Sequence, residues 1–218
     1  GQILPPVRDD RELETGHPVF KAFLESRICR TFARDEVRER VIPAYMGLIK
    51  QIDDQMGRLF SFMEERNLFD NTMIVFTSDH GDYLGDHWMG EKDLFHDQSV
   101  KVPLIIYDPR SQANATRGTS CDLLVESIDL APTFQSFFGG PPLPHILEGR
   151  DLTPILTGEA DANTWRTFLF SEYDYAVKEA RARIGNAQED ARLVMIRDAR
   201  YKYINAEGFR PMLFDLQE

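Results

Sequence analysis

Acidic, imidazole and amine side chains are concentrated in the stretch NTMIVFTSDHGDYLGDHWMGEKDLFHD, residues 71–97. Within it, TMIVFT (residues 72–77) is short, continuously apolar and partly β-branched, which favours a buried β-strand. Asp79 and His80 follow this segment closely. Because open α/β sheets bind ligands at the carboxyl ends of their strands, we expect both side chains to reach a binding site.

An aspartate oxygen and an imidazole nitrogen together suit a divalent cation, so Asp79 and His80 are candidate metal ligands. Three glycines permit the tight turns that would return Lys92 to the same cleft: Gly81, Gly85 and Gly90. A phosphoryl, phosphonyl or sulfuryl group held between the cation and Lys92 would be stabilised from both sides. Each unit-charge contact is worth on the order of 4 kcal/mol at about 4 Å and an effective dielectric of about 20, before desolvation costs.

Each of these residues also has a structural explanation. An Asp-His pair after a strand commonly forms a turn with a satisfied hydrogen bond, and a single lysine such as Lys92 is commonly a solvated surface residue. His87 and His96 carry the same ambiguity, and Trp88 could belong to the core. The combination of strand, Asp-His-Gly, glycine-hinged loop, lysine and second buried strand favours the binding site.

The elements around this stretch predict an α/β fold. Apolar residues recur at steps of three and four from about residue 38 to residue 63, which predicts a long amphipathic helix with Pro43 in its first turn. These positions are Val41, Tyr45, Leu48, Ile49, Ile52, Met56, Leu59, Phe60 and Met63. A second buried strand is predicted over VPLIIYD, residues 102–108. We therefore expect a partial sandwich with a largely parallel sheet.

The pattern of predicted elements changes after Trp165. Short strand candidates separated by turns predict a small antiparallel sheet. They are FLFSEY (168–173), RLVMIRD (192–198), YKYIN (201–205) and MLFDL (212–216). The expected organisation is a connector over residues 1–35, an α/β core over 36–160 and a truncated C-terminal α+β subdomain over 161–218.

The composition excludes some classes of protein. The 218 residues are 42% hydrophobic and 28% charged, as in an ordinary globular protein. The formal net charge of −11 argues against nonspecific binding to nucleic acid or to an anionic membrane, so we expect neither as a partner. No apolar run is long enough to span a bilayer. With two cysteines and no signal peptide at the first residue, we expect a cytoplasmic location.

The stretch NTMIVFTSDHGDYLGDHWMGEKDLFHDQSVKVPLIIYDP resembles the C-terminal half of sulfatases in the alkaline-phosphatase superfamily, and most of all phosphonate monoester hydrolases. The resemblance continues through YMGLIKQIDDQMGRLFSFMEERNLFDNT, SIDLAPTF, LEGRDLTPIL, FLFSEY and YKYINAEGFRPMLFDL, and so covers most of residues 40–218. It implies that Asp79 and His80 bind the active-site metal and that Lys92 contacts the anionic group of a small ester substrate. Many sulfatases have Asn in place of His80, and imidazole favours manganese, zinc or iron over calcium or magnesium. We expect manganese, with calcium, zinc, iron or magnesium as alternatives.

The resemblance also implies a nucleophile that these residues do not supply. In this family a cysteine in a Cys-x-Pro/Ala-x-Arg motif is converted to formylglycine. Cys29, in CRTFAR, and Cys121, in CDLLV, do not fit that motif. The family's N-terminal metal-binding carboxylates and its His-Pro-Pro segment have no counterpart either. We therefore expect no nucleophile within these 218 residues, which would be a fragment of the enzyme, inactive alone and at most a weak metal binder.

Three functions remain open. The leading hypothesis is a fragment of a metal-dependent hydrolase of phosphonate monoesters or phosphodiesters, with its formylglycine nucleophile in a missing N-terminal half. An arylsulfatase would use the same machinery. A non-catalytic oligomerisation or binding module is the third. In each case we expect an exposed apolar surface that packs against the missing half or a homo-oligomer partner.

Overall fold

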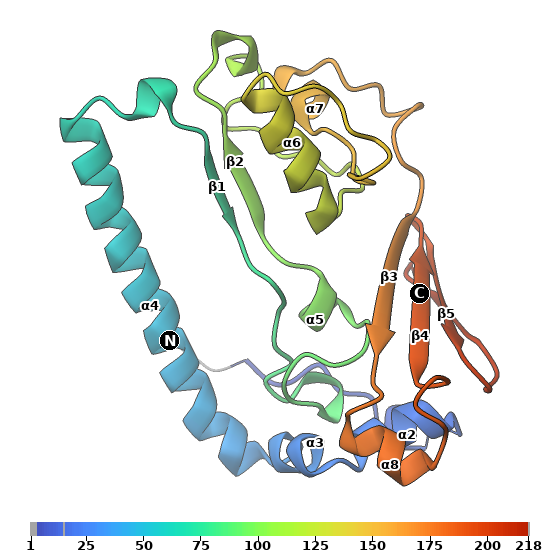
Figure 1. Ribbon diagram of the computed structural model, residues 1–218. Helices are drawn as coiled ribbons and strands as arrows, with labels where there is room; N and C mark the ends of the chain where they lie inside the picture. The colour runs from blue at the N-terminus through green and yellow to red at the C-terminus, as the bar shows by residue number, and fades with distance from the viewer. Residues whose placement is uncertain (1–3, 15, 218) are drawn as a thin grey trace.

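The computed structural model describes residues 4–14 and 16–217 (Figure 1). Its helices are α1 (Asp10–Leu13), α2 (Pro18–Leu24), α3 (Arg27–Phe32), α4 (Asp35–Glu65), α5 (Asp97–Val100), α6 (Leu130–Phe137), α7 (Thr153–Thr157) and α8 (Glu179–Ile184). Short 3₁₀ turns are η1 (Phe69–Asn71), η2 (Asp86–Trp88), η3 (Ser111–Ala113) and η4 (Ser127–Asp129). The strands are β1 (Ile74–Thr77), β2 (Leu104–Tyr107), β3 (Leu169–Asp174), β4 (Arg192–Arg197), β5 (Tyr201–Ala206) and β6 (Met212–Asp215).

The predicted α/β class and the small C-terminal antiparallel sheet are confirmed. Strands β3, β4, β5 and β6 pair in sequence order, and every pair is antiparallel. Side chains along β5 alternate between the two faces of the sheet, so Lys202, Ile204 and Ala206 are buried while their neighbours are exposed. The sequence analysis identified these strands as short segments separated by turns. The domain limits at residues 35 and 160 stay a prediction.

The expectation of a largely parallel sheet is wrong for the strand pair that follows α4. Strands β1 and β2 form a two-stranded sheet and run antiparallel, with Ile74 opposite Tyr107 and Thr77 opposite Leu104. A parallel pair needs a crossover connection, which is usually a helix packed on the sheet. The segment between β1 and β2 contains only the short η2 and α5, so β2 returns beside β1 in the opposite direction.

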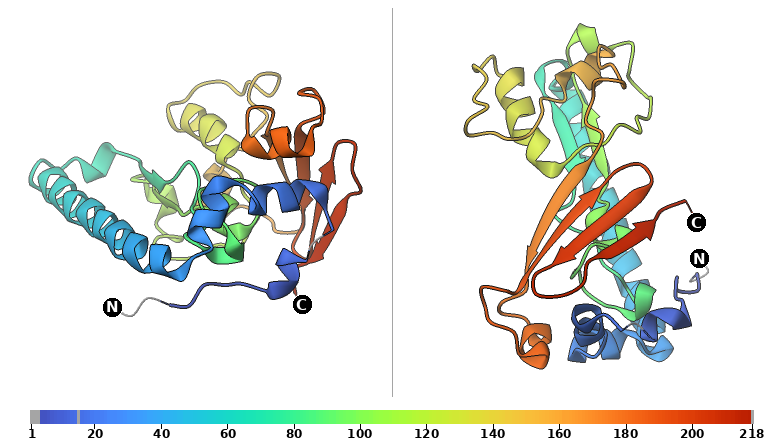
Figure 2. Two further views of the ribbon diagram at one scale, coloured as in Figure 1. Left: turned by 90° about the horizontal axis from the view of Figure 1, so that it is seen from below. Right: turned by 90° about the vertical axis from the view of Figure 1, so that its right-hand side faces the viewer.

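The main core joins the N-terminal helices, the C-terminal sheet and the loop after β1. Helix α2 packs against α8 (Figure 2), and its Val19 and Phe23 are buried with Leu193 of β4 and Ile204 of β5. Four loop residues join the same cluster: Tyr83, Met89, Leu94 and Phe95. The predicted connector over residues 1–35 is therefore more ordered than expected, because part of it is helical and buried. The loop that carries the candidate site is held by this core.

Helix α4 confirms the predicted long helix but begins earlier than expected. It starts at Asp35, so Pro43 lies inside the helix rather than in its first turn. Asp35 and Glu36 are acidic residues in the first turn, where they complement the positive end of the helix dipole. Although α4 has 31 residues, no helix in the described ranges is long and apolar enough to cross a membrane.

The apolar stripe of α4 is largely exposed in this chain. Its exposed members include Leu48, Ile49, Ile52, Leu59 and Phe60. Two further exposed apolar side chains, Phe76 and Ile105, lie on the neighbouring β1 and β2. Figure 1 shows α4 along one side of the molecule beside β1, with the C-terminal sheet on the opposite side. An amphipathic helix normally buries such a stripe, so this surface is suited to packing against further polypeptide.

Candidate metal and substrate site

Asp79 and His80 form a close pair just beyond the carboxyl end of β1. The Nε2 atom of His80 lies 3.3 Å from Oδ2 of Asp79. The Nδ1 atom of His80 lies 2.8 Å from the carbonyl oxygen of Gly81. Because a carbonyl oxygen only accepts, Nδ1 carries a proton, which leaves Nε2, beside the carboxylate, as the ring nitrogen available to a metal. A fixed tautomer of this kind is what a metal-ligating histidine requires, so the pair fits a divalent cation.

The electrostatics keep Asp79 available as an anion. The backbone N–H of His80 donates to Oδ1 of Asp79 at 2.9 Å, and this hydrogen bond is the main cause that lowers the pKa of the carboxyl group. The side chain of Asp79 is 82% exposed, whereas that of His80 is 38% exposed. The carboxylate is therefore ionised at neutral pH and open to a ligand.

A nearby acid, Asp82, was not singled out in the sequence. Burial raises the pKa of its carboxyl group, while a hydrogen bond from the backbone N–H of Leu84 to Oδ1, at 2.9 Å, acts to lower it. An acid two residues after His80 was the only signal for it in the sequence.

Lys92 is exposed, and its ammonium group forms no ion pair within residues 4–14 and 16–217. This leaves the positive charge free to meet an anion. Whether Asp79, His80 and Lys92 act on one ligand stays a prediction, because within the described residues the lysine side chain forms no hydrogen bond or ion pair with the other two.

One buried residue, Ser99, links the metal-ligand segment to the lysine segment. The backbone N–H of Gly81 donates to the carbonyl oxygen of Ser99 at 2.8 Å. The hydroxyl of Ser99 donates to the carbonyl oxygen of Lys92. Ser99 is 3% exposed, so these bonds are shielded from water. Ser99 therefore fixes the backbone of both parts of the candidate site at one point.

We call residues 81–99 the lysine loop. Five of its non-glycine residues have positive φ angles: Leu84, His87, Trp88, Glu91 and Leu94. Side chains rarely adopt this conformation, and such strain persists only where the surroundings over-determine it. Two of the glycines named in the sequence analysis are required by this backbone. Gly85 has φ +99°, and a Cβ on Gly90 would lie 2.3 Å from the ring of Phe32. The loop is a rigid, tightly packed structure.

The C-terminal sheet anchors the lysine loop through two acids. Asp93 accepts a hydrogen bond from the hydroxyl of Tyr173 on β3 and forms a 2.8 Å ion pair with Lys178. Asp97 contacts Nζ of Lys202 on β5 at 3.1 Å and Arg197 of β4 at 3.0 Å. The subdomain predicted for residues 161–218 thus positions the candidate site.

The first helices of the chain also contact the lysine loop, and the segment before α1 does so as well. Nε of Arg8 donates to the carbonyl oxygen of Gly85 at 2.7 Å, and Nε of Arg38 donates to that of Leu84 at 3.0 Å. Glu12 reaches His87 at 2.6 Å. These contacts join residues far apart in the sequence, so no local motif indicated them.

Cys29 is a buried thiol, and Cys121 is an exposed one. Cys29 is 2% exposed, and burial raises the pKa of its thiol, which disfavours the reactive thiolate. Cys121 is exposed and lies in a different part of the chain from the lysine loop. The expectation that neither cysteine is the nucleophile stays a prediction.

The structure thus combines an α/β fold with a carboxylate–imidazole pair at a strand end and the lysine loop. Comparison with known proteins gives the family. The profile of the sulfatase family matches residues 9–140, and that of the N-sulphoglucosamine sulphohydrolase C-terminal region matches residues 85–218. The chain belongs to the sulfatase family.

Among curated relatives, a multifunctional alkaline phosphatase superfamily protein from Trinickia caryophylli is 36% identical over 190 residues, covering 86% of this chain and 36% of that protein. An arylsulfatase from Clostridium perfringens is 34% identical over 137 residues, covering 63% of this chain and 28% of that protein.

Among solved structures, the phosphonate monoester hydrolase of Silicibacter pomeroyi superposes with a TM-score of 0.85 at 31% identity, covering 99% of this chain and 44% of that one. The phosphonate monoester hydrolase of Agrobacterium radiobacter gives a TM-score of 0.83 at 29% identity and covers 100% of this chain and 45% of that one. The chain therefore spans less than half the length of these relatives.

Proposed function

We propose that this chain supplies the metal-binding Asp79 and His80 and the anion-binding Lys92 of a hydrolase of phosphonate monoesters or phosphodiesters. The observation that supports this most is the position of His80, whose Nδ1 faces the Gly81 carbonyl oxygen and whose Nε2 lies 3.3 Å from the Asp79 carboxylate. The likeness to two phosphonate monoester hydrolases supports the same substrate class. The relatives' greater length supports a formylglycine nucleophile elsewhere in a longer polypeptide.

Each of the three residues would have its own role in the reaction. Asp79 and His80 hold the cation, which when bound acts as a Lewis acid toward an anionic ester oxygen. Lys92 neutralises charge on a nonbridging oxygen of the same group. Only interactions that strengthen in the transition state accelerate the reaction, so the Lys92 contact counts where it tightens as charge develops on that oxygen.

The metal role predicts that Mn²⁺ binds weakly to this chain at His80. Two protein ligands seldom hold an ion tightly, so millimolar rather than micromolar Mn²⁺ is expected to be needed. Titration with Mn²⁺ followed by NMR should broaden the signals of Asp79 and His80 first. His80→Ala should abolish this broadening, whereas His145→Ala, at an exposed histidine, should leave it unchanged. Equal broadening in the His80→Ala variant would reject the metal role.

An arylsulfatase function is the second candidate, favoured by the 34% identity to the Clostridium perfringens arylsulfatase. Both functions use the same cation and lysine, so this chain alone does not discriminate between them. A panel of aryl phosphonate, phosphodiester and sulfate esters, tested on the longer polypeptide, separates the two through the ratios of kcat/KM.

We further propose that the exposed apolar stripe of α4, with β1 and β2, packs against the remainder of the sulfatase fold. The support is the length of the relatives, of which this chain covers 44% in the Silicibacter pomeroyi enzyme. That fold would occupy the surface and bring further metal ligands to Asp79 and His80.

With this surface open, the isolated chain is expected to self-associate at micromolar concentration. Ile52→Glu places a charge in the stripe and should shift the species toward monomer in light scattering coupled to size exclusion. Gln55→Glu adds the same charge at another exposed position of α4 and should have little effect. A chain that is monomeric at all concentrations would contradict the proposed surface.

A further inference from the structure

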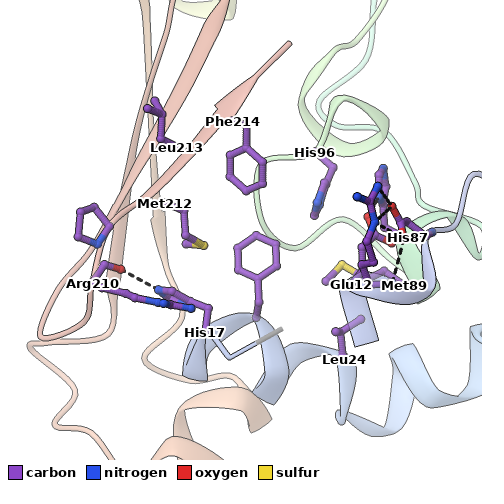
Figure 3. A pocket seen from close by; sticks show the side chains of 14 residues that line it. Glu12, His17, Leu24, His87, Met89, His96, Arg210, Met212, Leu213 and Phe214 are labelled. Carbon is purple, nitrogen blue, oxygen red and sulfur yellow. Dashed lines mark hydrogen bonds and ion pairs between the residues drawn. The ribbon is translucent and has the colours of Figure 1, made fainter. Parts of the chain in front are cut away.

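Three potential metal ligands meet at a place the sequence did not indicate. Glu12 comes from α1, His87 from η2 and His96 from the residue before α5. One ligand atom of each lies within 4.8 Å of the others, and all three residues are half-buried. Figure 3 shows them together on one side of a pocket of about 520 Å³. None of Asp79, His80 and Lys92 lines this pocket, so the cluster is separate from the candidate active site.

The hydrogen bonds of His96 determine its tautomer. The hydroxyl of Tyr83 donates its single proton to the carbonyl oxygen of Asp93 at 2.7 Å. The same hydroxyl oxygen lies 2.9 Å from Nδ1 of His96 and therefore accepts from an Nδ1–H group. With Nδ1–H directed to Tyr83, Nε2 is the ring nitrogen of His96 that offers a lone pair to a metal.

The contacts of His87 contain a conflict that a cation would resolve. Nδ1 of His87 lies 2.6 Å from Oε1 of Glu12, and Nε2 lies 3.1 Å from Oε1 of Gln98. The amide nitrogen of Gln98 faces Oδ2 of Asp86 at 3.4 Å, which fixes the orientation of the amide. Both ring nitrogens of His87 therefore face acceptor oxygens, but a neutral imidazole donates from only one nitrogen.

With Nε2–H donated to Gln98, the Nδ1 atom and the Glu12 carboxylate require a positive species between them. A proton on Nδ1 would make an ion pair, whereas a metal ion would use the Nδ1 lone pair directly. Metal-ligating histidines commonly donate their other N–H to a fixed acceptor, which is the arrangement that Gln98 provides for His87 and Tyr83 provides for His96.

We propose that Glu12, His87 and His96 bind Zn²⁺ or a chemically similar divalent transition-metal ion. Two imidazole nitrogens and one carboxylate oxygen are donors that suit zinc. The imidazole rings stack at 4.1 Å with 19° between their planes, and a metal lies near the plane of each ring it binds, so one ring turns out of the stack on binding. The ion would tie α1 to the lysine loop and leave a coordination position open to the pocket.

The experiment uses the 218-residue chain with His80→Ala and Cys121→Ser, which removes the candidate active-site imidazole and the exposed thiol as competing donors. Calorimetric titration should give one Zn²⁺ per chain, and Co²⁺ should produce visible d–d absorption that Zn²⁺ displaces. Glu12→Gln and His96→Gln should each lower the affinity by at least about tenfold, since loss of mere supporting partners already costs about 10–100-fold.

Two further variants test whether the measured metal binding depends on the hydrogen bonds that orient the proposed ligands. Tyr83→Phe keeps the buried ring but removes the hydroxyl that orients His96, and should weaken binding by about tenfold. His145→Gln changes an exposed histidine elsewhere and should have no effect. Circular dichroism confirms that each variant is folded; Glu12 lies on α1, which contains no buried residues, so Glu12→Gln preserves the fold.

The proposal is overturned by either of two results. The first is no Co²⁺ absorption and no Zn²⁺ uptake in the His80→Ala, Cys121→Ser chain. The second is an affinity that Glu12→Gln and His96→Gln leave unchanged. In either case the cluster is a Glu12–His87 ion pair stacked on neutral His96, and ¹⁵N NMR would show protons on both nitrogens of His87.

Discussion

Gly81→Ala is expected to abolish cation binding at Asp79 and His80 and to destabilise the chain by about 3 kcal/mol. A Cβ atom at this position would lie 1.9 Å from the carbonyl oxygen of Gln98, which is backbone and does not turn aside like a side chain. The loop must therefore shift. That shift breaks the bond from the Gly81 N–H to Ser99 and moves the carbonyl that fixes the tautomer of His80.

The measurements are urea unfolding and the Mn²⁺ titration described for His80. Gly57→Ala is the matched control because a Cβ there meets nothing within 4 Å and the residue lies within α4. Alanine in a helix is favoured over glycine, so this control should stabilise the chain by up to about 1 kcal/mol. A Gly81→Ala chain with unchanged stability and unchanged Mn²⁺ broadening would show that the close approach does not position the site.

The strands were predictable because apolar runs and turns are local features of the sequence, although β1 and β2, expected to be buried, expose Phe76 and Ile105 in this chain. The apolar run at residues 72–77 and the alternation around Leu193 and Ile204 depend only on neighbours in the sequence. The direction of β2 was not predictable in this way, because it depends on which strands lie beside it. Similarly, the start of α4 at Asp35 was missed since apolar periodicity begins only where the helix has an apolar face to pack.

The candidate site and the second cluster likewise differ in how far local sequence predicts them. Asp79 and His80 are adjacent, and their geometry follows from one strand end and one turn. The cluster of Glu12, His87 and His96 joins residues 75 positions apart at its Glu12–His87 contact, and His87 adopts a positive φ that no residue pattern predicted. Such long-range contacts form because the buried apolar residues of the lysine loop pack in the core, and that packing is a property of the whole fold.

The ion pair between Asp129 and Arg166 governs a different part of the fold. Two guanidinium nitrogens of Arg166 bind the two carboxylate oxygens of Asp129 at 2.6 and 2.7 Å. The side chain of Arg166 is 8% exposed, and that of Asp129 is 0% exposed. The same carboxylate accepts from the backbone N–H groups of Glu126 and Arg150 at 2.7 Å each. It therefore holds together η4, the segment before α7 and the segment before β3.

Arg166→Ala should lower the free energy of unfolding by about 3–5 kcal/mol, because it leaves a buried carboxylate without its cation. Urea unfolding measures the loss. Arg183→Ala is the control, since it breaks an ion pair with Glu179 one helical turn away that is exposed on both sides, and it should cost only about 0.3–0.5 kcal/mol.

If Arg166→Ala leaves too little folded protein for a titration, Arg166→Lys supplies the comparison. Lysine retains the charge but lacks the planar fork that binds both carboxylate oxygens, so an intermediate loss is expected. The order of stability should be wild type, then Arg183→Ala, then Arg166→Lys, then Arg166→Ala. A cost below about 1 kcal/mol for Arg166→Ala, the range of exposed pairs, would mean that water reaches Asp129 and that its backbone hydrogen bonds are sufficient to hold these segments together.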